Sequence, residues 1–216
     1  MKKIIFAFVV TGILFSCNST KKKNDSVKNT ASIINPNLKP INTNEALVAT
    51  ALMAAPEESR PGCKIIGYNL AGEFVTFKEG TNEFVVLVDN PKQSGFNAAC
   101  YHKDLEPFMA RGRALRANGK NRQEIFEIRS AEMKSGKLSI PTGTTVHIYY
   151  GAKEMYDPKT SKVADAQLRY VVYMPYATTE STGLPARPMA KNHPWIMNPG
   201  THRAHIMISP LPEESE

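Results

Sequence analysis

Histidine is the residue type in this sequence that is best suited to acid–base and metal chemistry. Its five copies are His102, His147, His193, His202 and His205. The last three fall within thirteen positions. Imidazole is a common zinc ligand, so these three together with a carboxylate such as Glu58 or Asp104 suggest a metal-assisted hydrolase. However, the sequence has no HExxH, GxSxG, Walker or CxxC motif. We therefore expect no metal and no cofactor, and keep the hydrolase as the alternative hypothesis.

His205 directly precedes an apolar Ile-Met-Ile run that predicts a strand. A polar side chain at the mouth of such a strand needs a hydrogen-bond partner or faces a cleft. We expect a partner such as Asp89 or Tyr149, and a place for His205 in a binding surface. The other interpretation is structural, with His205 bonded to a buried backbone group.

The segment before this strand, Thr178 to His202, holds four prolines and the only tryptophan, Trp195. Loops longer than about 12–15 residues are usually functional or disordered. Because a tryptophan is costly to leave in water, we expect this loop to pack against the folded body. The predicted binding residues are His205, His202, Trp195 and Tyr149.

The cysteines lead to two further hypotheses. Cys100 lies two residues before His102, and a thiol with a depressed pKa beside a base is a nucleophile. This arrangement would make a thiol hydrolase, the second form of the alternative hypothesis. We favour a disulfide between Cys63 and Cys100, because these two remain once Cys17 is lipidated and exported proteins meet an oxidising compartment.

The N-terminus has the features of an exported lipoprotein. Lys2 and Lys3 precede an apolar stretch, residues 4–15, which is too short for a membrane span of about 20 residues. The stretch ends in Leu14-Phe15-Ser16-Cys17, which resembles the lipobox of bacterial lipoproteins. We predict a signal peptide (residues 1–16), then a lipidated Cys17 and flexible tether (residues 17–40). The predicted location is the bacterial cell envelope, with the lipid anchored in a membrane.

The net charge of +7 is concentrated near the N-terminus. Residues 1–42 hold seven lysines and one acidic residue, so the rest of the chain has 20 basic and 19 acidic residues. Nucleic-acid binding draws its energy from clustered lysine and arginine side chains on the folded surface. A nearly neutral body lacks that excess, and we expect no nucleic-acid partner.

Hydrophobic periodicity predicts three helices in the folded body. The first begins at a capping-box spacing of Asn42 and Glu45 and ends before Pro56. The second runs from Leu105 to about Leu115. The third begins at a second capping-box spacing, Asn121 and Glu124.

Alternating and continuous apolar runs predict six strands. They span residues 64–68, 73–77, 83–88, 144–150, 169–174 and 204–209. We expect the first three to form an antiparallel meander, followed by an irregular loop from Asp89 to Cys100. The predicted fold is a single α+β domain, residues 41–216, with antiparallel strands, about three helices and long loops in the C-terminal third.

Short motifs in a fixed order resemble a family of secreted bacterial proteins of unknown function. They are an Ala-Ala-Pro helix end at residues 54–56, Glu-Gly-Thr-Asn at 79–82, Asp-Asn-Pro at 89–91, Cys100, and His-Ile-Met-Ile at 205–208. Relatives often carry a cysteine in the strand after the second motif, whereas this chain has Phe84 to Val88 there and its other cysteine at Cys63. The resemblance covers most of residues 46–210 and implies no activity.

Two classes of function follow from these residues. The favoured one is an envelope lipoprotein with a non-catalytic binding role, whose partner is a small ligand, a glycan or an envelope protein. The alternative is a metal-assisted or thiol hydrolase that uses the cluster of His193, His202 and His205, or Cys100. The absence of a catalytic motif favours binding.

Overall fold

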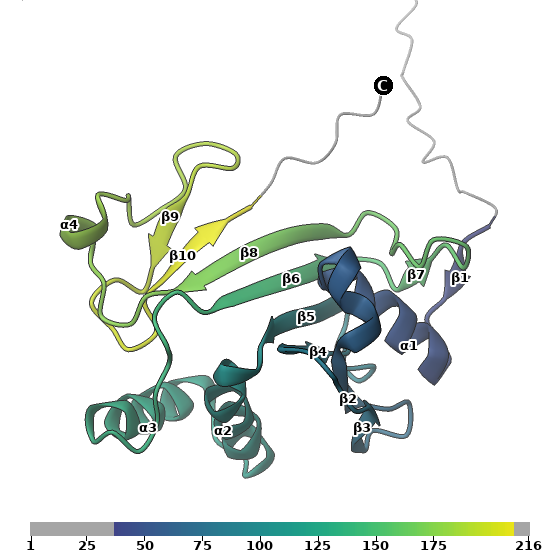
Figure 1. Cartoon of the computed structure of the whole chain (residues 1–216), viewed down its shortest axis with the longest axis horizontal. Helices are drawn as coiled ribbons and strands as arrows, with labels where there is room; N and C mark the ends of the chain where they lie inside the picture. Colours follow the sequence, from purple (N-terminus) through teal and green to yellow (C-terminus); the bar gives the residue numbers. More distant parts are fainter. Residues whose placement is uncertain (1–36, 210–216) are drawn as a thin grey trace, which may run out of the picture. The chain divides into compact units, whose positions relative to one another are not determined.

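The computed structural model describes residues 37–209 of the 216-residue chain. An eight-stranded sheet in the order β3-β2-β4-β5-β6-β8-β10-β9 forms its centre (Figure 1). The strands are β2 Lys64–Tyr68, β3 Phe74–Lys78, β4 Phe84–Leu87, β5 Phe96–His102, β6 Thr145–Gly151, β8 Gln167–Tyr173, β9 Trp195–Met197 and β10 His205–Ile208. The predicted α+β class is confirmed. The predicted signal peptide, Cys17 and most of the tether lie outside the described residues.

The three predicted helices are present as α1 Asn44–Ala51, α2 Glu106–Ala117 and α3 Arg122–Lys134. The described part of the chain also holds a short helix and three 3-10 turns. These are α4 Thr179–Thr182, η1 Leu52–Ala54, η2 Glu57–Gly62 and η3 Lys103–Leu105.

The start of α3 confirms the predicted capping box. The Asn121 side chain accepts from the Gln123 and Glu124 amides, and the Glu124 carboxylate accepts from the Asn121 amide at 2.8 Å. The start of α1 is shifted by one residue from the prediction. Thr43 is the cap, and its hydroxyl accepts from the Ala46 amide at 3.1 Å.

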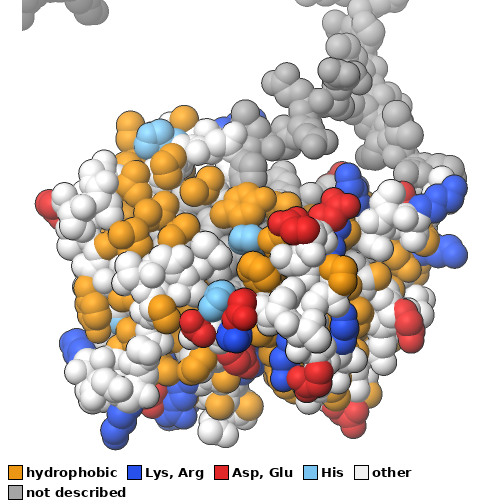
Figure 2. Space-filling model, viewed as in Figure 1, with side chains coloured by type: hydrophobic (Ala, Val, Ile, Leu, Met, Phe, Trp, Pro, Cys, Tyr) orange, Lys and Arg blue, Asp and Glu red, His pale blue; other side chains and the backbone are white. Residues whose placement is uncertain are grey.

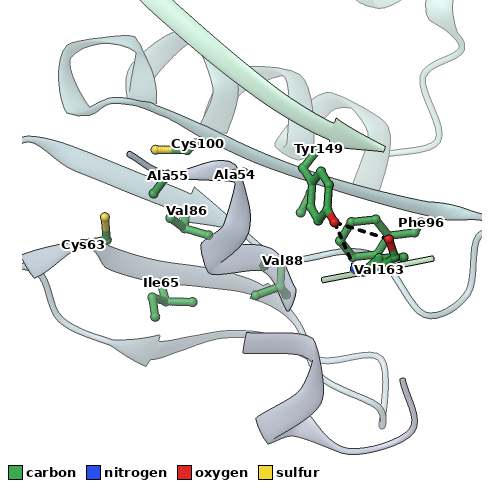
Figure 3. Close-up of a cluster of buried hydrophobic side chains, with 12 residues drawn as sticks. Ala54, Ala55, Cys63, Ile65, Val86, Val88, Phe96, Cys100, Tyr149 and Val163 are labelled. Carbon is green, nitrogen blue, oxygen red and sulfur yellow. Dashed lines mark hydrogen bonds between the residues drawn. The ribbon is translucent and has the colours of Figure 1, made fainter. Parts of the chain in front are cut away.

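The sheet buries an apolar cluster on each face. Residues of α1 and η1 pack over one face, against side chains that include Val86, Cys100 and Tyr149 (Figure 3). Residues of η3 and α2 pack over the other, against side chains that include Val85, Tyr101 and Tyr173. Neighbours in sequence such as Cys100 and Tyr101 therefore belong to different clusters, as the alternation of a strand requires.

The predicted meander is wrong, because β4 pairs in parallel with β2 rather than antiparallel with β3. The β3–β4 connection is tied to the start of β2, where the Thr81 and Asn82 amides donate to the Gly62 carbonyl at 2.8 and 3.1 Å. The chain thus passes the start of β2 before β4 begins on the side of β2 opposite β3. A Cβ on Gly80 would lie 2.5 Å from the Lys64 amide nitrogen, so this close crossing needs glycine.

The segment predicted as an irregular loop before Cys100 contains β5, a central strand between β4 and β6. Its sequence, Phe-Asn-Ala-Ala-Cys-Tyr-His, has no β-branched residue and only two aromatic residues that favour strands, so local propensity gives a weak strand signal. Pairing on both sides and burial against both clusters determine the strand instead.

The loop between β6 and β8 and the predicted loop from Thr178 to His202 both contain short strands. Met155–Tyr156 forms β7, which pairs with β1, Lys39–Pro40. We expected the folded body to begin at Ile41. The paired backbone begins two residues earlier, at Lys39. In the second loop, Trp195–Met197 forms β9 and pairs with β10, which confirms that this loop packs against the body; Ile196 is fully buried.

Candidate binding pocket beside Trp195

A cavity of about 620 Å³ lies against β8, β10 and β9. Side chains of these strands line it on one side, and residues 188–193 line it on the other. Its volume falls within the usual range of about 300–1,000 Å³ for small-molecule sites. We call it the Trp195 pocket.

Strand register explains why these side chains meet. Met207 of β10 lies opposite both Trp195 of β9 and Val171 of β8. Arg169 shares the face of Val171, two residues away. Phe108 of α2 packs on Tyr173 at the other end of β8, with ring centroids 6.0 Å apart. The helices thus cover one end of this face, and the pocket occupies the other.

The wall of the pocket is rich in methionine and includes the only tryptophan. Met189, Met197 and Met207 line it together with Trp195. Met189 has 75% of its surface exposed. Figure 2 shows hydrophobic side chains gathered at the upper left, the part of the view where Figure 1 places α4, β9 and β10. Flexible, polarisable methionines adapt to apolar ligands of varied shape.

Two polar side chains of the pocket have buried atoms without partners. The Arg169 guanidinium lies over the Tyr150 ring, 4.2 Å from its centroid. Within residues 37–209, neither Arg169 Nε nor Asn192 Oδ1 has a hydrogen-bond partner. Both side chains are half-buried and line the pocket, so their more exposed polar atoms can contact a polar ligand group.

The predicted binding residues occupy three places. Trp195 lines the pocket, and so does His193. His202 and His205 lie at the opposite end of β10, outside the pocket lining. Tyr149 lies on the other face of the sheet, where its hydroxyl accepts from the Val163 amide at 2.9 Å and its ring packs edge-to-face on Phe96 (Figure 3).

His205 has a different partner from the one we expected. Its Nδ1 lies 2.7 Å from the Arg203 carbonyl, and its ring packs against Tyr173 with centroids 5.4 Å apart. Asp89 instead accepts from the Asn97 amide at 3.0 Å. The expected Asp89 or Tyr149 partner is therefore wrong, and the hydrogen bond matches the structural interpretation of His205. Burial lowers the pKa of His205.

The structure does not bring the three C-terminal histidines together. His193 lines the pocket, while His202 is buried against Phe108 and Phe126. In the described range, 37–209, no group of three or more His, Cys, Asp or Glu side chains is placed to hold a metal ion. Neither proposed carboxylate joins such a group, and the hydrolase hypothesis stays untested.

Cys63 and Cys100 are both buried free thiols (Figure 3). Cys63 donates to the Ser59 carbonyl at 3.2 Å. Burial and, next, the neighbouring Cys63 raise the pKa of Cys100 to about 12. His102 interacts with Asp104 and Glu83. A thiol with a raised pKa is a poor nucleophile. The disulfide between the two cysteines stays a prediction.

Sequence reasoning missed Arg169, Met189 and Asn192 as pocket residues. Period-two alternation does place Arg169 on the face of Val171, but its neighbours depend on β9, which the sequence did not reveal. Asn192 has a positive φ of 59°, and asparagine is one of the few residues that tolerates this conformation.

The described residues include no helix long and apolar enough to cross a bilayer. Comparisons of the chain with protein-family models, curated proteins and solved structures found no match.

Proposed function

We propose that this chain is a non-catalytic binding protein of the bacterial envelope, held at a membrane by a lipid on Cys17. Its ligand is a small amphipathic molecule that enters the Trp195 pocket. The observation that carries this proposal is a pocket of ligand size whose apolar lining also includes the cations Arg169 and Lys191. The lipobox supports the envelope location.

The pocket lining determines the ligand chemistry. Trp195 and the methionines favour an apolar body, because contact with them removes apolar surface from water. Arg169 and Lys191 favour a negatively charged end. We therefore infer an anionic amphiphile rather than a neutral glycan or a second protein. A folded protein partner would need a larger surface, about 800 Å² on each side.

The single tryptophan makes this proposal directly measurable. Anilinonaphthalene sulfonate is an anionic amphiphile that accepts energy from tryptophan. In the full chain, we expect saturable energy transfer from Trp195 to this probe. Met189→Ser should weaken binding because Met189 is an exposed part of the pocket wall. Arg169→Gln should weaken it by removing the cation.

The matched control is Leu70→Ser, which changes another exposed apolar side chain, 42% accessible and outside the pocket lining. It should leave probe binding unchanged. Equal loss of binding in Met189→Ser and Leu70→Ser, or no saturation, would contradict the pocket as the site. Competition by a neutral oligosaccharide but not by a fatty acid would favour the glycan instead.

The anchor is tested separately from the pocket. Cys17→Ser should move the protein from the membrane fraction to the soluble fraction of fractionated cells, because it removes the residue that carries the lipid. Probe binding should be unaffected. Retention of Cys17→Ser in the membrane fraction would refute the lipid anchor.

A further inference from the structure

A second group of unpaired polar atoms lies where the start of β10 meets α2 and α3. Arg129, His202 and Arg203 form it, and we call it the basic cluster. Arg129 has 8% of its surface exposed and His202 has 1%. Among the described residues, Arg129 Nε, Arg203 Nε and both ring nitrogens of His202 are buried without a hydrogen-bond partner.

Arg129 is a buried cation without a bonded carboxylate in the described structure. Its Nη1 donates to the Phe108 carbonyl at 3.3 Å, and its guanidinium lies 4.0 Å from the centroid of the Phe108 ring. A Cβ on Gly112 would lie 2.9 Å from Nη1, so α2 has a glycine where this guanidinium packs. The charge of Glu132 acts on Arg129, but its carboxylate is bonded to a different residue. Both of its oxygens accept from Arg111 Nε, at 2.9 and 3.0 Å.

His202 lies between aromatic rings. Its ring centroid is 4.7 Å from that of Phe126 and 6.2 Å from that of Phe108. A buried imidazole without partners is costly, because both nitrogens have lost their hydrogen bonds to water. Burial first, then the charges of Arg129 and Arg203, lower the pKa of His202 to about 4.

Arg203 brings a second guanidinium to the same place. Its charge acts on Tyr173, Arg129 and His202. Lys134 adds a further positive charge that acts on His202. Lys134 is exposed and Arg203 is half-buried, so the cluster has a solvent side at the end of α3.

We propose that the basic cluster binds a phosphate group of a small soluble molecule. Two guanidinium groups and the single N–H of the neutral His202 ring present several donors, and a tetrahedral oxyanion has enough acceptor oxygens for all of them. The anion would also neutralise Arg129, whose buried charge is costly without a partner. This site is distinct from the Trp195 pocket, at the other end of β10.

Inorganic phosphate is the probe. In melts of the full chain at constant ionic strength, with chloride as the balancing anion, phosphate should raise Tm. Above the dissociation constant, the rise should be about 3 °C for each tenfold increase in phosphate. The His202 ring signals should shift in NMR spectra over the same titration. Arg203→Gln should abolish both effects.

Arg122→Gln is the matched control, because it removes the same charge from the exposed first turn of α3. It should retain the full response, which excludes a general effect of phosphate on the folded state. The proposal is overturned if phosphate and chloride give the same melts, or if Arg203→Gln responds as Arg122→Gln does.

Arg129→Met separates anion binding from a structural role of Arg129. Methionine keeps an unbranched side chain against Phe108 and removes the buried charge. We expect this variant to melt no lower than the wild type in chloride and to lose the phosphate response. A lower Tm in chloride with an intact phosphate response would show that Arg129 is structural, and would overturn its part in the site.

Discussion

The backbone amide of Asn192 donates a 3.1 Å hydrogen bond to the carbonyl of Ser209. This bond joins residues 188–193 to the residue that follows β10, and thereby holds one wall of the Trp195 pocket against the sheet. Asn192 makes the bond with a positive φ of 59°. The wall therefore depends on a backbone conformation that few residues adopt.

Replacement of Asn192 should open this wall in one variant and preserve it in another. Proline cannot take a positive φ and has no amide hydrogen, so Asn192→Pro should detach the wall. Glycine adopts this φ readily, so Asn192→Gly should retain it. Acrylamide quenching of Trp195 should increase in Asn192→Pro and stay near the wild-type value in Asn192→Gly. Equal quenching in both variants would contradict the role of this hydrogen bond.

Tyr149→Phe should reduce stability without affecting the pocket. The Tyr149 hydroxyl accepts from the buried Val163 amide, and its loss leaves that donor unpaired at a cost of about 1–3 kcal/mol. Urea unfolding should show this loss, while energy transfer from Trp195 to the probe stays unchanged. A weaker probe affinity with unchanged stability would instead support the binding role that the sequence suggested for Tyr149.

His202 should contribute a loss of stability as the pH falls from about 6.5 to 4. In the folded state, burial and the neighbouring arginines lower the pKa of His202 to about 4 from its usual value of 6.5. The unfolded chain therefore takes up a proton first, and the loss is on the order of 2–3 kcal/mol.

Asp89 opposes this effect and defines the control. Burial raises the pKa of Asp89 to about 6 from 3.8, so the folded state binds that proton first as the pH falls. The contribution of His202 is therefore the difference in the free energy of unfolding between wild type and His202→Gln. Urea unfolding at each pH across this range measures it. A constant difference between pH 6.5 and 4 would contradict the lowered pKa of His202.

The two buried cysteines should form a disulfide in protein isolated from the envelope. The two thiols are neighbours in one apolar cluster and act on each other electrostatically. The bond would close a loop of about 36 residues and contribute about 2–4 kcal/mol. Thiol titration of the denatured, unreduced protein should detect neither cysteine. Detection of both would show that they remain as free thiols.

Local signals predicted some elements well. The Asn121 and Glu124 pair determines the start of α3 because both hydrogen bonds of a capping box lie within one turn. Alternation similarly indicated β8 and β10. The position of β4 depends on hydrogen bonds to Gly62, which lies about twenty residues away. Such a contact leaves no periodic signal in the strand itself.

The candidate site was predictable only in part. Trp195 indicated that its loop would pack down, because a large apolar side chain favours burial. Arg169 and Met189 become neighbours only through the register of three strands and the path of a loop. The basic cluster likewise depends on the packing of α3 against the segment before β10, so the spacing of Arg129 and His202 along the chain gave no indication of it.

The outer edge of β9 has a consequence for how copies of this protein behave at high density. Unpaired edge strands invite another chain to add to the sheet, which leads to aggregation. Here the Ile196 amide already donates to the Pro185 carbonyl at 2.9 Å. Proline has no amide hydrogen with which to continue a ladder. The edge is therefore occupied by the protein's own loop, which makes it a poor template for strand addition between crowded molecules.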